Sequence, residues 1–237
     1  LFLGTGSAVA TKTYVDDVFS TYLYSGTGSN SGSAQTITNG IDLAGKGGLV
    51  MSKVRNKTYS WGFTDTVRGV NKFISSNNNN AETTTTGDDQ GITSFNNNGF
   101  TLGKDNVPGI INYGGDGSIY TTSTFRKLPG FFDIVTWTGN GSNRTIAHSL
   151  GSVPGCIMIK GTTIARDWNV YHRGIGNDHY LELNTNNAKA QEGTGGVQTW
   201  NNTSPTATTF SLGPSWDVNK DGIDYVAYLF AGGESTA

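Results

Sequence analysis

The sequence has little cysteine and little charge, and it lacks long apolar runs. Its single cysteine, Cys156, allows no disulfide framework, so stability has to come from packing or assembly. Only 14% of the 237 residues are charged and the formal net charge is −2, which argues against nucleic acid as a partner. Since no apolar stretch reaches the ~18 residues of a membrane-spanning helix, we expect no membrane insertion.

Helix-forming runs are also scarce. No convincing 3.6-residue apolar periodicity extends over a helical length, which argues against long amphipathic helices. Instead the chain holds 34 glycines together with 5 tryptophans, 10 tyrosines and 11 phenylalanines. Aromatic residues and threonine favour half-buried strands, and glycine and asparagine favour tight turns. This composition predicts an all-β fold of short antiparallel strands in a β-sandwich, jelly-roll-like arrangement.

Familiar catalytic and metal-binding motifs are absent from the sequence. It contains no phosphate-binding loop, no His-Glu-x-x-His or Cys-x-x-Cys metal pair and no Gly-x-Ser-x-Gly nucleophile turn. His172 and His179 do not have the spacing of a zinc site. Asp167, Asp178 and Glu182 supply carboxylates, but no pattern selects two of them as the acid and base of a glycosidase. We therefore expect a protein that is not an enzyme.

An internal repeat is the strongest positive signal in the chain. Residues 48–53 resemble 155–160, residues 100–103 resemble 210–213, and residues 120–125 resemble 225–230. We expect an N-terminal lead-in at residues 1–20, one β-sandwich module at 21–127 and a second at 128–237, related by internal duplication. The Pro129-Gly130 turn between the copies favours docked modules over a flexible tether.

The repeat separates residues that the fold uses twice from residues that occur once. Trp61 and Trp168 recur, so we expect both to pack in cores. Arg68 and Arg173 also recur, and a structural ion pair or a carbonyl clamp is the expected role. His172 occurs in one copy only, where the first copy has Asp65, and Cys156 lies in an apolar run as a small core residue.

Two further tryptophans are the candidate binding residues. Trp200 and Trp216 border predicted loops, so we expect them at the surface, where an indole can stack on a sugar ring. Trp200 ends an expected strand at residues 197–200. The polar stretches 76–90 and 184–196 occupy corresponding places in the two copies, and we expect both to form exposed loops.

One acidic run has the opening of a calcium loop. Asp217, Asn219 and Asp221 fall at the first, third and fifth positions and a glycine follows, as in an EF-hand. The twelfth position, however, is Tyr228 instead of an acidic residue. An Asn/Asp/Gly hairpin turn explains the same residues more simply. Calcium therefore stays a weak candidate, and we expect no other cofactor.

A resemblance to a known family is carried by residues 13–24, 67–72, 98–103, 125–133, 148–155, 170–174 and 225–231. These segments resemble structural proteins of marine tailed bacteriophages, including cyanophages. The resemblance covers most of residues 13–233. It implies a virion structural protein of the tail fibre-like kind, with no defined catalytic residues.

We accordingly expect a non-enzymatic protein of the virion surface. Its β modules would attach to the host cell surface or to other virion parts, with other virion structural proteins or a host surface glycan as partners, in a homo-oligomer. Two alternatives stay open: a capsid or tail decoration protein with no receptor role, and a carbohydrate-active depolymerase domain. Because the chain begins with Leu1, we expect it to be a piece of a longer protein.

Overall fold

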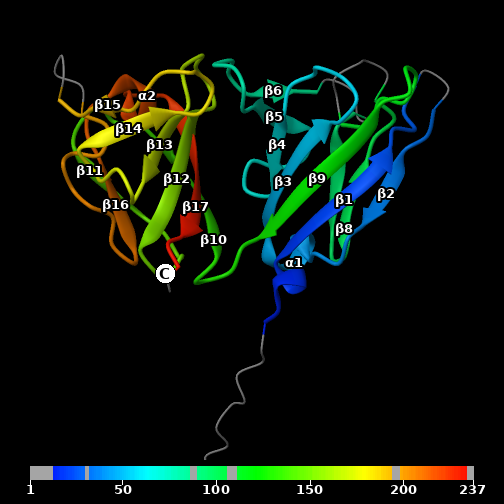
Figure 1. The fold of residues 1–237 in the computed structure, drawn as a ribbon, viewed down its shortest axis with the longest axis horizontal. Coiled ribbons are helices and arrows are strands. Elements are labelled where there is room, and N and C mark those ends of the chain that lie inside the picture. The colour runs from blue at the N-terminus through cyan, green and yellow to red at the C-terminus, as the bar shows by residue number, and fades with distance from the viewer. Residues whose placement is uncertain (1–12, 30–31, 86–89, 106–110, 194–197, 234–237) are drawn as a thin grey trace, which may run out of the picture.

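The computed structural model describes residues 13–29, 32–85, 90–105, 111–193 and 198–233. It has two lobes, each made of a large antiparallel sheet with a smaller sheet on one side (Figure 1). The predicted all-β sandwich fold is thereby confirmed. Residues 1–12 of the expected lead-in lie outside the described residues. The remainder of the lead-in contains a short 3-10 helix, η1 (Val15–Asp17), just before the first strand.

The first module uses strands from both ends of its sequence in one large sheet. The sheet order is β1 (Phe19–Ser25), β9 (Ile119–Arg126), β3 (Gly48–Val54), β4 (Gly62–Asp65), β5 (Lys72–Ser75) and β6 (Thr83–Thr84). The small sheet runs in the order β2 (Gln35–Thr38), β8 (Gly99–Leu102) and β7 (Ile92–Asn96). One helical turn, α1 (Leu43–Lys46), precedes β3 and is capped by the Asp42 carboxylate.

The second module has a large sheet of the same strand order. It runs β10 (Phe132–Thr138), β17 (Asp224–Ala231), β12 (Pro154–Gly161), β13 (Asn169–His172), β14 (His179–Glu182) and β15 (Ala190–Gln191). The small sheet pairs β11 (Arg144–Ala147) with β16 (Thr209–Leu212), and α2 (Trp216–Asn219) precedes β17. Of the strand expected at residues 197–200, residue 197 lies outside the described residues, and residues 198–200 contain a bend and no strand. No helix in the described ranges has the length and apolar character needed to cross a bilayer.

The pairing of neighbouring strands shows which residue of the first module corresponds to which residue of the second. Met51 pairs with Phe63 as Met158 pairs with Val170, so Trp61 corresponds to Trp168 and Asp65 to His172, as the repeat predicts. The expected equivalence of Arg68 and Arg173 is wrong. The N–H of Arg173 donates to Gly155 O as the N–H of Thr66 donates to Gly48 O, so Arg173 takes the place of Thr66.

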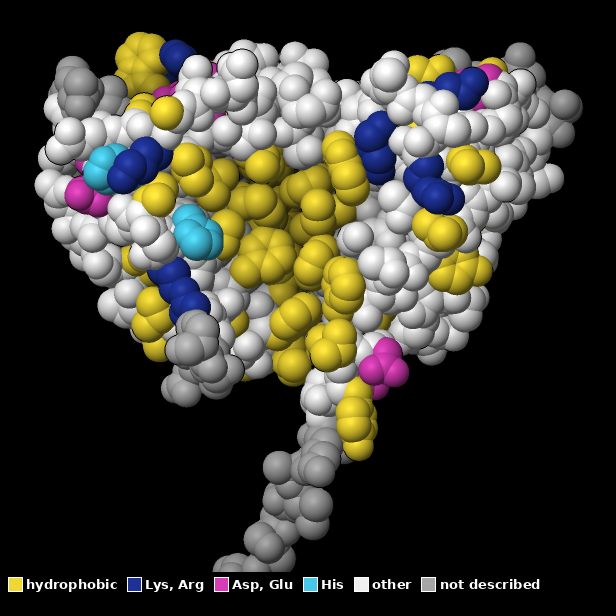
Figure 2. Space-filling view, in the orientation of Figure 1, with side chains coloured by type: hydrophobic (Ala, Val, Ile, Leu, Met, Phe, Trp, Pro, Cys, Tyr) yellow, Lys and Arg dark blue, Asp and Glu magenta, His cyan; other side chains and the backbone are white. Residues whose placement is uncertain are grey.

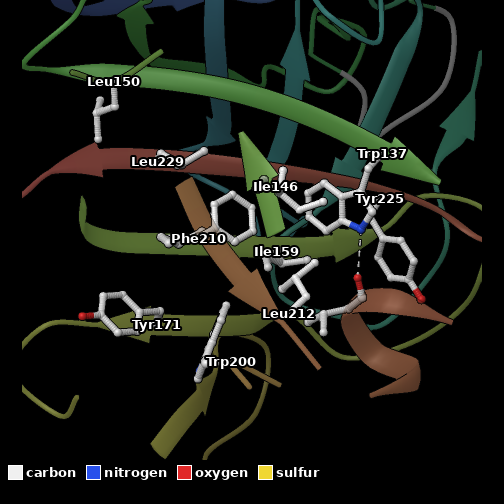
Figure 3. Close-up of a cluster of buried hydrophobic side chains, with 13 residues drawn as sticks. Trp137, Ile146, Leu150, Ile159, Tyr171, Trp200, Phe210, Leu212, Tyr225 and Leu229 are labelled. Carbon is white, nitrogen blue, oxygen red and sulfur yellow. Dashed lines mark hydrogen bonds between the residues drawn. The ribbon is translucent and has the colours of Figure 1, made fainter. Parts of the chain in front are cut away.

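The described part of the chain forms three apolar cores. One fills each sandwich, and Figure 3 shows that of the second module. The third lies between the two large sheets, where both modules contribute. Its buried members are Leu49, Phe63, Ile74, Phe132, Ile134, Trp168, Val226 and Tyr228. On the face shown in Figure 2, apolar side chains line the junction of the lobes. Partly buried residues packed against this core are Met51, Phe125, Phe131, Met158 and Phe230.

Trp168 is central to the core between the modules. Its indole is fully buried, stacks on Tyr228 at 6.2 Å between ring centroids, and meets Phe63 edge-on at 5.4 Å. Its Nε1–H donates to Ser75 O of the first module at 2.9 Å. The expected core role of Trp168 is thus confirmed. The same expectation is wrong for Trp61, which is only half-buried and belongs to none of the three cores, so the same position serves differently in the two modules.

We predict that Trp168→Ala lowers the free energy of unfolding by about 3–5 kcal/mol, since it empties a fully buried indole site and frees a carbonyl. Trp216→Ala is the matched control, because the Trp216 side chain is 57% exposed, and it should cost at most about 1 kcal/mol. Urea unfolding of both variants measures the difference. Equal losses would contradict the central role of Trp168.

Candidate functional site

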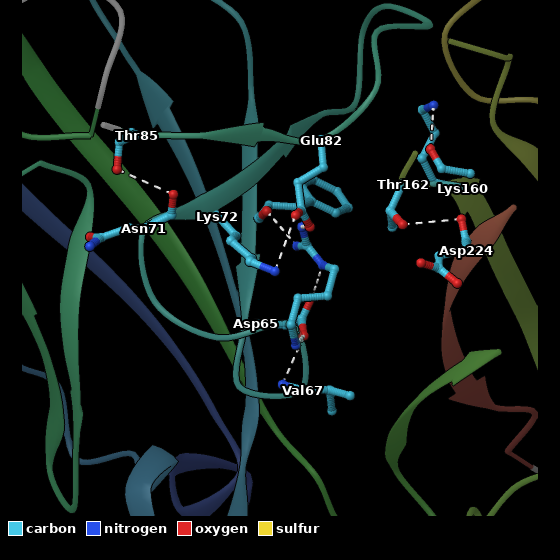
Figure 4. Close-up of polar contacts among 12 residues, drawn as sticks. Asp65, Val67, Asn71, Lys72, Glu82, Thr85, Lys160, Thr162 and Asp224 are labelled. Atoms are coloured by element: carbon cyan, nitrogen blue, oxygen red, sulfur yellow. Dashed lines mark hydrogen bonds and ion pairs between the residues drawn. The ribbon is translucent and has the colours of Figure 1, made fainter. Parts of the chain in front are cut away.

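A polar cleft lies between the two modules, beside their shared core (Figure 4). Its volume is about 350 Å³, which is within the range of small-ligand sites. The first module contributes Val67, Arg68, Lys72 and Glu82, and the second contributes Thr136, Thr138, Thr162, Thr163 and Asp224 together with parts of Trp137 and Tyr225. The cleft therefore combines hydroxyl groups with charges of both signs.

The wall from the first module is built on Arg68. Its side chain is 4% exposed, and Nε donates to Asp65 Oδ2 at 2.6 Å while one terminal nitrogen donates to Glu82 Oε2 at 2.9 Å. The other terminal nitrogen donates to Phe63 O and to the Tyr228 hydroxyl, which itself donates to Asp65 Oδ2 at 2.8 Å. The expected ion-pair role of Arg68 is confirmed. The network also joins the modules, because Tyr228 belongs to the second.

Burial raises the pKa of the Tyr228 hydroxyl well above its usual value, so this group stays protonated as a donor to Asp65. Glu82 pairs with Lys72 at 3.5 Å as well as with Arg68, and its N–H donates to Thr162 O of the second module. The Glu82 carboxylate, shared by two cations, therefore fixes this wall of the cleft, and the Glu82 N–H bonds it to the second module.

The wall from the second module presents threonine hydroxyls around Asp224. Thr138 Oγ1 donates to Asp224 Oδ1 at 2.6 Å, and Thr162 Oγ1 donates to Asp224 O at 3.1 Å. The N–H of Asp224 donates to Thr163 Oγ1 at 3.1 Å. Hydroxyls that both donate and accept, next to an exposed carboxylate, are suited to a polyhydroxylated ligand.

Trp200 lies in the core of the second module, not at the surface. Its side chain is 1% exposed and meets Tyr171 edge-on at 5.7 Å between ring centroids (Figure 3). The expectation of a surface aromatic at this position is therefore wrong. The bend at residues 198–200 turns the indole inward, where its apolar area is removed from water.

Trp216, by contrast, is at the surface, with 57% of its side chain exposed. Lys220 Nζ lies 4.1 Å from the ring centroid and the Arg166 guanidinium carbon 5.6 Å, and such contacts stabilise by cation–π attraction. The backbone is anchored because the buried Tyr225 hydroxyl donates to Trp216 O at 2.7 Å. Trp216 is thus an exposed aromatic on a fixed support.

The calcium-loop residues do not converge on one point. Asn219 is fully buried, and its amide donates to Gly213 O at 3.1 Å and to Ser142 O at 2.7 Å, while its Oδ1 accepts from the N–H of Asn140. Asp217 faces Arg166 at 3.8 Å. Asp221 is exposed in the turn before β17. Asn219 thus serves as a buried clamp on backbone carbonyls, and the weak calcium candidate is not supported.

Asn112 repeats this clamp in the first module. It is fully buried, its amide donates to Gly103 O at 2.6 Å, and its Oδ1 accepts from the N–H of Thr27 at 3.1 Å. Gly103 corresponds to Gly213 in the repeat. The acidic run therefore reflects a structural requirement of the fold.

The other carboxylates bind separate neighbours. Asp167 accepts from the Asn184 amide, and Glu182 accepts from Thr185 and Asn187. Asp178 is hydrogen-bonded to His179. Within the described ranges, no group of three or more His, Cys, Asp or Glu side chains has the geometry of a metal site. Arg173 donates to Gly233 O, which confirms the expected carbonyl clamp.

Sequence reasoning missed a buried lysine near the cleft. Lys160 has no exposed surface, and its Nζ donates to the carbonyl oxygens of Gly161, Ile164 and Asn79, the last from the first module. Burial lowers the pKa of Lys160 to about 8. Lys53, its counterpart in the repeat, likewise donates to three carbonyls. The sequence did contain a signal for this buried lysine, because a lysine ends the same apolar strand in both copies.

We predict that the free energy of unfolding of the wild type rises relative to that of Lys160→Met between about pH 8 and pH 10, by about 1 kcal/mol per pH unit. The folded pKa of Lys160 is below its unfolded value of 10.5, so the unfolded chain binds more protons in this window and stability rises with pH.

Urea unfolding of both proteins across this window measures the difference. Burial raises the pKa of Cys156 to about 11, which opposes the trend in each protein alone but cancels in the difference. A difference that does not change with pH would contradict the prediction.

The comparisons with known proteins give a family and no function. No curated protein and no solved structure matches the chain. One family model matches residues 15–235, which include both modules and the cleft between them. Its description is "Domain of unknown function (DUF7483)", and the chain belongs to this family.

Proposed function

We propose that this chain is a non-enzymatic, tail fibre-like structural protein of a virion that attaches to a glycan of the host surface. The resemblance of its sequence to phage structural proteins supports the virion role. The observation that carries the attachment role is the cleft between the modules, which has a volume of about 350 Å³ and walls of threonine hydroxyls and charged groups.

The arrangement of the molecule suits display of this cleft. In Figure 1, the first strand begins and the last strand ends at one end of the molecule, whereas α2, β6 and β15 lie at the opposite end. Trp216 in α2 adds an exposed aromatic surface at the displayed end. Loops on a rigid scaffold can bind partners without disturbing the cores.

Tight attachment would come from several weak sites acting together. Polar saccharide sites are individually weak, and a symmetric homo-oligomer multiplies them through effective concentration. The partly buried apolar side chains along the junction in Figure 2 offer a surface for such assembly, since a contiguous apolar patch marks an interaction site.

We predict that Lys72→Ala lowers the affinity for a host-surface polysaccharide about tenfold, because Lys72 lies in the cleft and is 41% exposed. Lys57→Ala is the matched control: its side chain is 35% exposed and pairs with Asp116 outside the cleft, at 3.7 Å. Since both lysines are partly exposed and each of their ion pairs contributes at most about 1 kcal/mol, neither variant should unfold.

A glycan array selects the ligand, and calorimetric titration of the two variants and of Trp216→Ala measures the affinities. Equal affinities for the Lys72 and Lys57 variants would exclude the cleft, and no binding to any host glycan would reject the attachment role. Immunogold labelling of particles separates a tail position from head decoration. Loss of polymer viscosity on incubation would favour a depolymerase instead.

A further inference from the structure

The first module contains a cavity at a place where the second module is filled. The cavity has a volume of about 40 Å³ and lies inside the sandwich, on the face of β3 and β4 that is turned away from the other module. Register gives the matching residues of the second module. At five lining positions the first module has the smaller side chain: Ser52 for Ile159, Gly62 for Asn169, Thr64 for Tyr171, Gly91 for Thr199 and Ile92 for Trp200.

Two kinds of hydrogen bond establish these matches. Val50 pairs with Thr64 as Ile157 pairs with Tyr171 in the large sheets. The N–H of Gly103 donates to Gly91 O, and the N–H of Gly213 donates to Thr199 O. Ile92 and Trp200 follow these acceptors directly in the chain, so they occupy the same place in the two sandwiches.

In the second module this place holds two aromatic rings. Tyr171 and Trp200 are 5% and 1% exposed and pack edge to face at 5.7 Å between ring centroids. Figure 3 shows the Tyr171 and Trp200 side chains next to each other in the core of the second module. In the first module, a hydroxyl-bearing side chain and an aliphatic one take their places, and the space stays partly open.

The walls of the cavity present mostly apolar surface. Trp61, Phe73 and Tyr120 contribute aromatic rings, with Val54, Ile92 and Ile111 as aliphatic neighbours. Several polar atoms at the wall are bound within the protein. Thr85 Oγ1 donates to Asn71 O, Lys53 Nζ donates to three carbonyl oxygens, and Ser52 Oγ donates to Gly62 O.

We propose that this cavity binds a single aromatic ring, either of a small molecule or of an exposed tryptophan or tyrosine side chain. The ring takes the place that the Tyr171–Trp200 pair fills in the second module. Trp61 is half-buried and forms part of the wall, so it is the side chain that can move outward as a ring enters. Offset or edge-to-face contacts with Phe73 and Tyr120 favour an aromatic ring over an aliphatic chain.

The size of the cavity sets the expected strength of binding. One water needs roughly 10–15 Å³ of such volume, so about 40 Å³ exceeds the space of one water but is less than an enclosed ring needs. Part of the ring therefore occupies the space vacated by Trp61. For a ligand of indole size with modest efficiency per atom, the dissociation constant is on the order of 1 mM.

The test introduces the residues of the second module into the first. Indole and phenol are titrated against the wild type and against Thr64→Tyr/Ile92→Trp, with saturation-transfer NMR and calorimetry as readouts. We expect the filled variant to lose at least about tenfold in affinity. Thr36→Tyr is the control, since it adds a tyrosine at an exposed position of β2 and should leave binding unchanged. N-acetyl-tryptophanamide is titrated in the same way and represents a tryptophan side chain of a partner protein.

Ser52→Ile is the second filling variant, used if the double substitution does not fold. It places the isoleucine of the second module on the cavity wall and should also abolish binding. Thermal melting establishes that each variant is folded. Failure of indole and phenol to saturate the wild type would overturn the proposal, and so would equal affinity for the wild type and a folded filled variant.

Discussion

An aromatic core that ends in a buried ionic network holds the two large sheets against each other. Trp168 and Tyr228 supply apolar area from one side and Phe63 from the other, and the Arg68 group continues the contact toward the cleft. A buried charge pair stabilises little unless every polar atom has a partner. Here the guanidinium reaches two carboxylates, a carbonyl and a hydroxyl. The apolar part supplies the buried area, and the fully partnered ionic part fixes the relative position of the modules.

This contact is not symmetric, although the strand order of the two modules is the same. Asp65 corresponds to His172, and Tyr228 pairs with Met158 at the place where Ser123 pairs with Met51. Each module thus supplies half of a network that neither could complete alone. Because the cleft is bordered by this network, its shape depends on docking of the modules and would be lost if they separated.

Patterns that the two copies share predicted structure better than patterns that occur once. The burial of Trp168 and the equivalence of its position to Trp61 followed from the repeat, but the repeat did not show that the Trp168 indole packs between the modules or that Trp61 is only half-buried. The surface role of Trp200 followed only from a nearby loop, and a bend returned the indole to the core. Asn219 looked like a cation ligand until its buried amide proved to hold backbone carbonyls. The cleft had no sequence signal, since tertiary docking alone brings Arg68 and Thr138 together.

The different filling of the two sandwiches follows from how each is stabilised. By the relation of ~24 cal/mol per Å³, a cavity of about 40 Å³ costs about 1 kcal/mol. The burial of one large aromatic side chain in the core between the modules offsets that cost several times over. The core between the modules buries the other face of both large sheets, so the fold tolerates a sandwich interior in the first module that is not fully packed. Docking thus frees interior positions of the first module, such as Thr64 and Ile92, to serve binding instead of stability.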